Sequence, residues 1–385
     1  MSGQNKVLSE RKRRTDGSSL LIISLNKPQA LNALDLDMVQ ELQRLFDAAR
    51  NDDSVSMVFI QGSGEKAFCA GGDVVSMYKA MQQETLEPNK APNFIQAFFT
   101  QEYQLDYCIH SFPKPIIAWG NGIIMGGGQG VFAGADIKIV TESARIAMPE
   151  ISIGLFPDVG ASYFLNKLDK GVGLFLGLTA SHINANDACA MGLATHKISN
   201  EFKDEFINLL LHMENADLSD LHLLASEVAA NCAFNSRPAI ISEYIDSIGQ
   251  HLGEVVSAEQ AHQALVEWKN TCEDKFIQKA VNNYASGCPT TTLIVYEQLK
   301  RGRNLSLADC FRMELNIAMT CGYKGEFQEG VRALLIDKDN APKWRYESIA
   351  EVPASEIEDY FNYFNQRSLG HPLAALEQQF GEYHE

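Results

Sequence analysis

Short apolar runs alternate with amphipathic stretches through the first half of the chain. Ser19–Leu25 and residues 55–60 are rich in Leu, Ile and Val and end at turn-forming residues, so strands are predicted there. Between them, apolar residues recur at helical spacing behind Asp35, which predicts a helix with that residue as its N-cap. The apolar positions of this helix are Met38, Leu42, Leu45, Phe46 and Ala49.

The same alternation returns further along the chain. A strand at 115–119 precedes a glycine-rich turn and a short apolar helix, and two more strands are predicted at 137–140 and 145–148. The uncharged stretch 115–135 is long enough to suggest a membrane span. Its seven glycines favour a buried strand, a tight turn and a packed helix instead. Strands that alternate with helices predict a parallel, layered α/β core.

Helical patterns dominate after about residue 200. Ser257 with Gln260 and Ser306 with Asp309 each resemble a capping box ahead of an apolar helical run. We therefore expect a core over residues 1–200 and a largely helical part over residues 201–385. Because no Pro/Ser-rich linker separates them, we expect the two parts to pack together.

Composition and charge restrict the classes of partner. The apolar fraction of 45% is ordinary for a globular protein, and the net charge of -17 argues against nucleic-acid binding. The eight cysteines contain no CxxC pair, so neither a metal site nor a disulfide framework is expected. The basic residues at 11–14 precede no apolar leader, and the globular pattern begins almost at once. These observations predict a cytoplasmic protein without metal or membrane contact.

Two glycine-rich turns follow predicted strands. Gly72 lies in FCAGGD (68–73), and Gly127 lies in MGGGQG (125–130), which opens the short apolar helix. Backbone N–H groups at such turns can face a ligand without side chains in the way, and those of a first helical turn lack partners. Taken alone, the first is explained better as a tight turn in which Asp73 caps the next helix. Close packing of helix on sheet also explains the second.

Two other enzyme classes fit the glycine turns less well. Gly128, Gly130 and Ala133 match a GxGxxA dinucleotide-binding pattern, but no second strand ends in an acidic residue at the expected distance. A serine hydrolase is disfavoured because no serine lies in a GxSxG elbow.

A pair of carboxylates follows the last predicted strand. Glu150 and Asp158 are separated by a loop that contains Gly154 and Pro157, and such a loop can fold back to bring both acids to one reacting centre. The plainer interpretation makes Asp158 the N-cap of the following helix and Glu150 a solvated loop acid. Local sequence alone favours that plainer interpretation.

Taken together and in this order, the segments resemble the crotonase, or enoyl-CoA hydratase/isomerase, superfamily. The resemblance rests on NKPQALNAL (26–34), AGGD and MGGG. Within the superfamily, MPEISIGLFPDVG (148–160) and EGVRALLIDKDNAPKW (329–344) resemble the 3-hydroxyisobutyryl-CoA hydrolases, over nearly the whole chain. The implied fold is a spiral of repeated β-β-α units with a largely helical C-terminal part. The implied reaction is hydrolysis of a short β-hydroxyacyl-CoA thioester in valine catabolism, with no cofactor beyond the CoA of the substrate.

The resemblance also assigns roles to individual residues. By their match to the family motifs, the N–H groups of Gly72 and Gly127 would form an oxyanion hole, and Glu150 and Asp158 would be the catalytic carboxylates. Glu102, in FFTQEY, matches a further acid that binds substrate. Glu150 would either activate water or attack the thioester directly, and Asp158 would orient the substrate hydroxyl or share proton transfer.

One position separates hydrolysis from hydration within this resemblance. Hydratases need a glutamate soon after the second glycine turn, and this chain has Gly130 there. A hydratase or isomerase and a non-catalytic acyl-CoA-binding protein remain the alternatives. After Asp158 the chain has VGAS where hydrolases are commonly richer in glycine, which predicts slightly different helix packing.

The sequence also suggests how CoA is held and how copies assemble. The loop 27–34 is expected to contact the CoA nucleotide, with Arg332 or Lys338 as candidate phosphate ligands that are each more simply read as surface charges. The resemblance allows a homo-oligomer, although the helical part could cover that interface.

Overall fold

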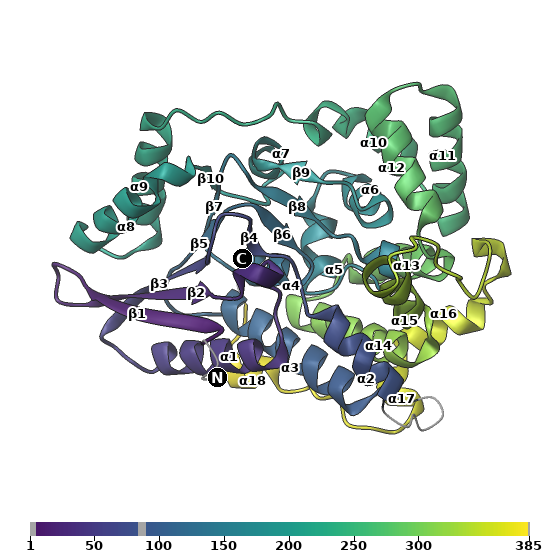
Figure 1. Ribbon diagram of the computed structural model, residues 1–385, viewed down its shortest axis with the longest axis horizontal. Coiled ribbons are helices and arrows are strands. Elements are labelled where there is room, and N and C mark those ends of the chain that lie inside the picture. The colour runs from purple at the N-terminus through teal and green to yellow at the C-terminus, as the bar shows by residue number, and fades with distance from the viewer. Residues whose placement is uncertain (1–4, 84–89, 384–385) are drawn as a thin grey trace.

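The computed structural model describes residues 5–83 and 90–383, and shows two layered sheets surrounded by helices (Figure 1). The larger sheet has the strand order β1-β2-β3-β5-β7-β10, and the smaller has the order β4-β6-β8-β9. The strands of the larger sheet are β1 (Val7–Arg13), β2 (Ser19–Leu25), β3 (Val55–Gly62), β5 (Ile116–Gly120), β7 (Ile137–Val140) and β10 (His196–Lys197). Those of the smaller sheet are β4 (Ala67–Cys69), β6 (Ile123–Met125), β8 (Arg145–Ala147) and β9 (Ile183–Asn184).

Successive strand pairs divide between the two sheets. In β3–β4, β5–β6 and β7–β8, the first strand joins the larger sheet and the second joins the smaller one, and helices follow each pair. The pairings between β3, β5 and β7 and between β4, β6 and β8 are all parallel. The predicted α/β class and the spiral of β-β-α units are therefore confirmed.

In the first half, helices form where they were predicted, behind Asp35, after each glycine turn and after Asp158, and further helices form that were not predicted. They are α1 (Leu36–Arg50), α2 (Val74–Gln83), α3 (Asn93–His110), α4 (Gly127–Ala133), α5 (Ala161–Phe164), α6 (Val172–Thr179) and α7 (Ala185–Ala190). Asp35 caps α1 as predicted, since its carboxylate accepts the backbone N–H of Met38 at 3.1 Å. The stretch 115–135 forms β5, β6 and α4 rather than a membrane span. Among the described residues, no helix is both long and apolar enough to cross a bilayer.

The second half is helical, and it packs on the sheets. Its helices are α8 (Lys203–His212), α9 (Leu218–Asn231), α10 (Ile245–Leu252), α11 (Ala258–Thr271), α12 (Lys275–Ser286), α13 (Pro289–Gly302), α14 (Leu307–Lys324), α15 (Glu326–Val331), α16 (Ala354–Phe361), α17 (Tyr363–Gln366) and α18 (Leu376–Phe380). Ser257 and Ser306 cap α11 and α14 as predicted. The division of the chain into two parts at residue 200 stays a prediction.

Both faces of the larger sheet are buried at its central strands β2, β3, β5 and β7. One face packs on the main core, which includes α1 and α3, and the other packs on apolar residues of α8 and α9. Trp119 of β5 lies in this second core, beside Phe59 and Phe206. Burial on two faces explains why these strands read as continuous apolar runs rather than as alternating patterns.

Candidate active site

A cleft of about 310 Å³ opens where the two glycine turns face each other. All five predicted site residues line this cleft, namely Gly72, Glu102, Gly127, Glu150 and Asp158. Most of its other lining is apolar, including Met77, Phe99, Leu155, Leu334 and Leu335. The structure thus brings together residues from both halves of the chain.

The two glycine turns lie side by side because their strands do. Gly72 follows β4, Gly127 begins α4 just after β6, and these two strands are parallel neighbours. A Cβ atom placed on Gly127 would lie 3.4 Å from the backbone nitrogen of Gly72. In the described part of the chain, neither of these N–H groups donates to a backbone carbonyl. Both donors are therefore available to one ligand atom.

The loop expected to contact CoA supports the first turn. The backbone N–H of Leu34 donates to the carbonyl of Gly71 at 2.8 Å, and the N–H of Asp73 donates to the carbonyl of Leu34 at 2.7 Å. Asp73 also accepts the N–H of Ser76, so it caps α2 as the plainer interpretation expected. The first turn is thus both a helix cap and a wall of the cleft.

Glu102 reaches the second glycine turn from α3. Its side chain is buried, and a Cβ on Gly127 would overlap its Oε1 atom. That oxygen has no hydrogen-bond partner within the described structure. A buried, unpartnered carboxyl oxygen in a cleft is suited to a ligand rather than to structural support.

Glu150 is buried, which contradicts its interpretation as a solvated loop acid. It begins the 3₁₀ turn Glu150–Ile153 after β8 and is only 4% exposed. Helix α15 packs on this turn so closely that a Cβ on Gly330 would overlap the backbone of Ile153. The Oε1 atom of Glu150 lies 3.0 Å from the Cβ position of Gly126, and its Oε2 atom has no partner among the described residues.

Asp158 does not cap the following helix, as the plainer interpretation of the sequence had it. Its side chain is buried instead. The next helix, α5, begins at Ala161 behind Gly160, and no side chain caps it. The carboxylate of Asp158 instead accepts the hydroxyl of Tyr103 at 2.8 Å. The backbone turns sharply after it, with φ of 54° at Val159 and 91° at Gly160. Asp158 lines the cleft, whereas its neighbours Pro157 and Val159 do not.

Two C-terminal helices hold the loop that carries Asp158. Glu314 of α14 accepts the backbone N–H groups of Gly160 and Ser162, both at 2.8 Å. Gln298 of α13 donates to the carbonyl of Pro157 and to the hydroxyl of Ser162. Both side chains are fully buried. The helical part therefore positions an acid of the cleft from more than 130 residues further along the chain.

Burial shapes the protonation of the three cleft acids. Desolvation raises the pKa of Glu150 well above its usual range, and repulsion from Asp158 raises it further. Desolvation likewise raises the pKa of Glu102, to which the charges of Asp158 and Glu150 add. The pKa of Asp158 is raised by burial to about 7, although the hydrogen bond from Tyr103 opposes this shift. The pKa of Asp158 suits a group that exchanges protons near neutral pH.

The raised pKa of Asp158 predicts how Asp158→Asn changes stability with pH. Between pH 3.8 and about 7, the unfolded wild-type chain releases this proton before the folded chain does, so wild-type stability falls as pH rises. Asparagine has no such proton. In urea unfolding, we expect Asp158→Asn to be more stable than the wild type at pH 8, by on the order of 2–4 kcal/mol, with the advantage vanishing near pH 4. Exposed Asp53→Asn is the control, and an equal gain for both variants would contradict the prediction.

Tyr103, Asp106 and Glu314 were not among the predicted site residues. Asp106 is fully buried, and neither carboxyl oxygen has a partner in the described structure. The helical pattern could have identified the two acids. Asp106, like Glu102, occupies a core-facing position of α3, and Glu314 occupies a core-facing position of α14. Acids at such positions are uncommon unless they are paired or functional.

Asp106 also explains why Gly130 cannot carry an acid. A Cβ on Gly130 would lie 2.7 Å from both Oδ2 of Asp106 and Cβ of Val159. Real Cβ atoms are essentially never this close to a neighbour. A glutamate at this position would therefore displace α3 or the Asp158 loop.

Of the two basic residues suggested for CoA, Arg332 has other partners. Arg332 forms ion pairs with Glu329, Asp337 and Asp339. Lys27, in the loop 27–34, pairs with Asp35 and Asp73. Arg332 is thus neutralised by carboxylates, which weakens its candidacy as a phosphate ligand.

Comparisons with known proteins agree with this geometry. The family model described as enoyl-CoA hydratase/isomerase matches residues 20–361. The chain is 35% identical to "3-hydroxyisobutyryl-CoA hydrolase, mitochondrial" of Danio rerio, over 90% of this chain and 88% of that one. It is 33% identical to the protein of the same name from Dictyostelium discoideum, over 92% and 91% of the two chains.

Solved structures give the same fold. A carnitinyl-CoA dehydratase from Mycobacterium thermoresistibile superposes with a TM-score of 0.79 at 30% identity, covering 93% of this chain and 96% of that one. An enoyl-CoA hydratase from Rhodobacter sphaeroides 2.4.1 superposes with a TM-score of 0.77 at 27% identity, covering 93% and 97%.

The comparisons contradict the expected cytoplasmic location. Both relatives carry "mitochondrial" in their names, which is at odds with a cytoplasmic expectation. The expectation rested partly on unpaired cysteines, and all eight are free thiols in the structure. Free thiols indicate a reducing environment but do not say which compartment provides it.

Proposed function

This chain belongs to the enoyl-CoA hydratase/isomerase family, and from that premise we propose that it hydrolyses the thioester of a short β-hydroxyacyl-CoA. The proposed substrate is 3-hydroxyisobutyryl-CoA, the substrate in the names of the curated relatives, which would place the reaction in valine catabolism. The observation that carries the proposal is which acidic residues line the cleft and which position lacks one. Glu150 and Asp158 line it, while the position at which a hydratase would carry a second glutamate is Gly130, closed off by Asp106.

In the proposed reaction, the thioester carbonyl binds between the N–H groups of Gly72 and Gly127. These donors stabilise the negative charge of the tetrahedral intermediate, and one such donor typically contributes about 2.7–4 kcal/mol to lowering the barrier. Ionised Glu150 either removes a proton from the attacking water or attacks the carbonyl itself. The C–S bond then breaks, and the CoA thiolate leaves and takes up a proton that derives from water. On the covalent route, a water molecule next hydrolyses the acyl–Glu150 anhydride, which releases the acid and restores the Glu150 carboxylate.

Glu102 and Asp158 complete the proposed site. Asp158, held by Tyr103, is assigned to the hydroxyl of the acyl group or to the proton that passes to the leaving thiol. Glu102 is assigned to substrate binding beside the oxyanion position. All of this chemistry uses side chains and backbone of the protein, with CoA as part of the substrate rather than a separate cofactor.

Two parallel assays test the proposed reaction. With 3-hydroxyisobutyryl-CoA, we expect release of free thiol, detected with a chromogenic disulfide. With crotonyl-CoA, we expect little change in the absorbance of the enoyl group. Loss of the enoyl absorbance without thiol release would instead support a hydratase, and CoA binding without either reaction would support a non-catalytic binding protein.

A further inference from the structure

A second cleft, of about 430 Å³, lies at the opposite end of strand β8 from the catalytic acids. It is lined by Arg145, the first residue of β8, whereas Glu150 follows the last. The other walls come from β9, from α12 and from the segment 232–240 after α9, which crosses above β9 in Figure 1. The two clefts share no lining residue. The volume lies within the range of small-molecule pockets.

Three cations line this second cleft, although the chain as a whole is strongly acidic. They are Arg145, Arg237 and Lys279, and in the described structure their side chains have neither an ion pair nor a hydrogen bond. Most other arginines of the chain do pair with carboxylates, as Arg14, Arg301 and Arg312 do. One acid, Glu142, also lines the cleft, and it accepts the backbone N–H of Asn200 at 2.9 Å. The cleft therefore has an excess of positive charge.

Arg237 is held over the cleft by buried and half-buried polar groups. The carboxylate of Asp187, which is fully buried, accepts the backbone N–H of Ile240 at 2.8 Å. Asn186 donates to the carbonyl of Arg237 at 2.8 Å, and Asn184 donates to the carbonyl of Pro238 at 2.7 Å. The segment is thus fixed by side chains of β9 and α7. These hydrogen bonds fix the backbone that carries Arg237, whose side chain borders the cleft.

His182 adds a further polar group without a partner, besides the three cations. Its Nδ1 atom is buried and makes no hydrogen bond within the described structure. Burial lowers the pKa of His182, and the charges of Arg145 and Lys279 lower it further. The ring therefore experiences the positive potential of the same two cations, and an anion in the cleft would relieve the repulsion among all of these groups.

We propose that this second cleft binds a small molecule that carries a phosphate group, at a site separate from the catalytic cleft. Two arginines can each offer paired N–H donors to phosphate oxygens, and the lysine adds a further charge-assisted donor. The limited volume favours a small molecule over a protein segment. This site would be independent of the thioester chemistry.

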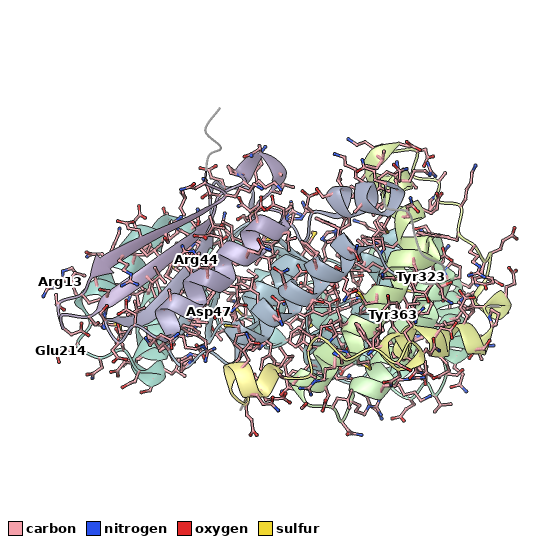
Figure 2. The ribbon with its side chains drawn as sticks, turned by 90° about the horizontal axis from the view of Figure 1, so that it is seen from below. Arg13, Arg44, Asp47, Glu214, Tyr323 and Tyr363 are labelled. Carbon is pink, nitrogen blue, oxygen red and sulfur yellow. The ribbon has the colours of Figure 1, made fainter. Side chains whose placement is uncertain are left out.

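Binding of inorganic phosphate and of AMP to the full-length protein tests the proposal. Phosphorus NMR titrations at about 0.15 M salt, where loose surface attraction is screened, should show saturable binding. The double variant Arg237→Gln with Lys279→Gln should weaken it at least tenfold. The control double variant Arg13→Gln with Arg303→Gln makes the same charge change elsewhere, and Figure 2 shows Arg13 at one far end of the molecule. This control should bind like the wild type.

The outcomes separate the alternatives. Equal weakening in both double variants, or no saturable binding in the wild type, would overturn the proposal. An acidic hexaglutamate peptide that binds more tightly than phosphate and AMP would show a site for a protein segment and would also overturn it. The KM for the CoA thioester should be the same in the first double variant and the wild type. A raised KM would place the cleft within the substrate site instead, whereas loss of thiol release in the wild type would count only against the proposed function.

Discussion

Replacing Glu150 by glutamine should lower kcat for thiol release from 3-hydroxyisobutyryl-CoA by about a thousandfold, within the range for loss of a general base or nucleophile. The amide keeps the shape of the side chain but cannot accept a proton or form an acyl intermediate. Folding should persist, because the change removes a buried group that is repelled by Asp158. Thermal unfolding and a stopped assay of thiol release measure both effects.

A matched control makes this result specific. Glu201→Gln has the same chemistry at an exposed position and should keep wild-type turnover. Because burial raises the pKa of Glu150, the wild-type rate should climb with pH above the usual titration range of a glutamate, as more of the carboxylate ionises. Near-native turnover of Glu150→Gln would show that the carboxylate is not needed, and would contradict the assignment of Glu150 as base or nucleophile. Single turnover in heavy-oxygen water then tests the covalent route, since label recovered in Glu150 indicates covalent attack.

Local patterns predicted the elements whose formation depends on local causes. The Asp35 cap, the apolar face of α1 and the strands β2 and β7 were readable because periodicity and capping act within a few residues. Strand β1 was not predicted, since only Val7 of its seven residues is buried and its charged residues show no alternation. It forms because it covers the edge of β2. That cause lies in its partner rather than in its own sequence.

The chemistry of the site depended on contacts that no local window contains. Locally, Asp158 suited a helix N-cap, and only Tyr103, 55 residues earlier, and Glu314, 156 residues later, turn it into a buried acid. Glu150 suited a solvated loop by its local sequence, but in the structure α15 covers the turn that Glu150 begins. The family resemblance identified both residues because it compares whole sites. The physical reasons for their burial became visible only in the fold.

Replacing Gly127 by alanine should lower kcat/KM for the CoA thioester by about a hundredfold to a thousandfold, similar to loss of an oxyanion donor. The added methyl would overlap Oε1 of Glu102, which is buried in the cleft beside it. Either the carboxyl group of Glu102 or the first turn of α4 must therefore move. Both lie next to the position assigned to the thioester oxygen. Gly72→Ala is the comparison, because its Cβ would meet only the ends of Met77 and Phe98 at about 3.2 Å. We expect a loss of about tenfold or less there, since contacts at this distance need shifts of only a few tenths of an ångström.

A double variant tests whether the clash with Glu102 is the cause. If it is, Glu102→Ala should remove the overlap, so that the combination with Gly127→Ala loses little more activity than Glu102→Ala alone. Effects of residues in direct contact are expected to be non-additive in this way. Fully multiplicative losses would instead mean that Gly127 acts independently of Glu102, through its own backbone geometry at the start of α4. The measurement therefore distinguishes a glycine required for space beside an acid from one required for the direction of its N–H group.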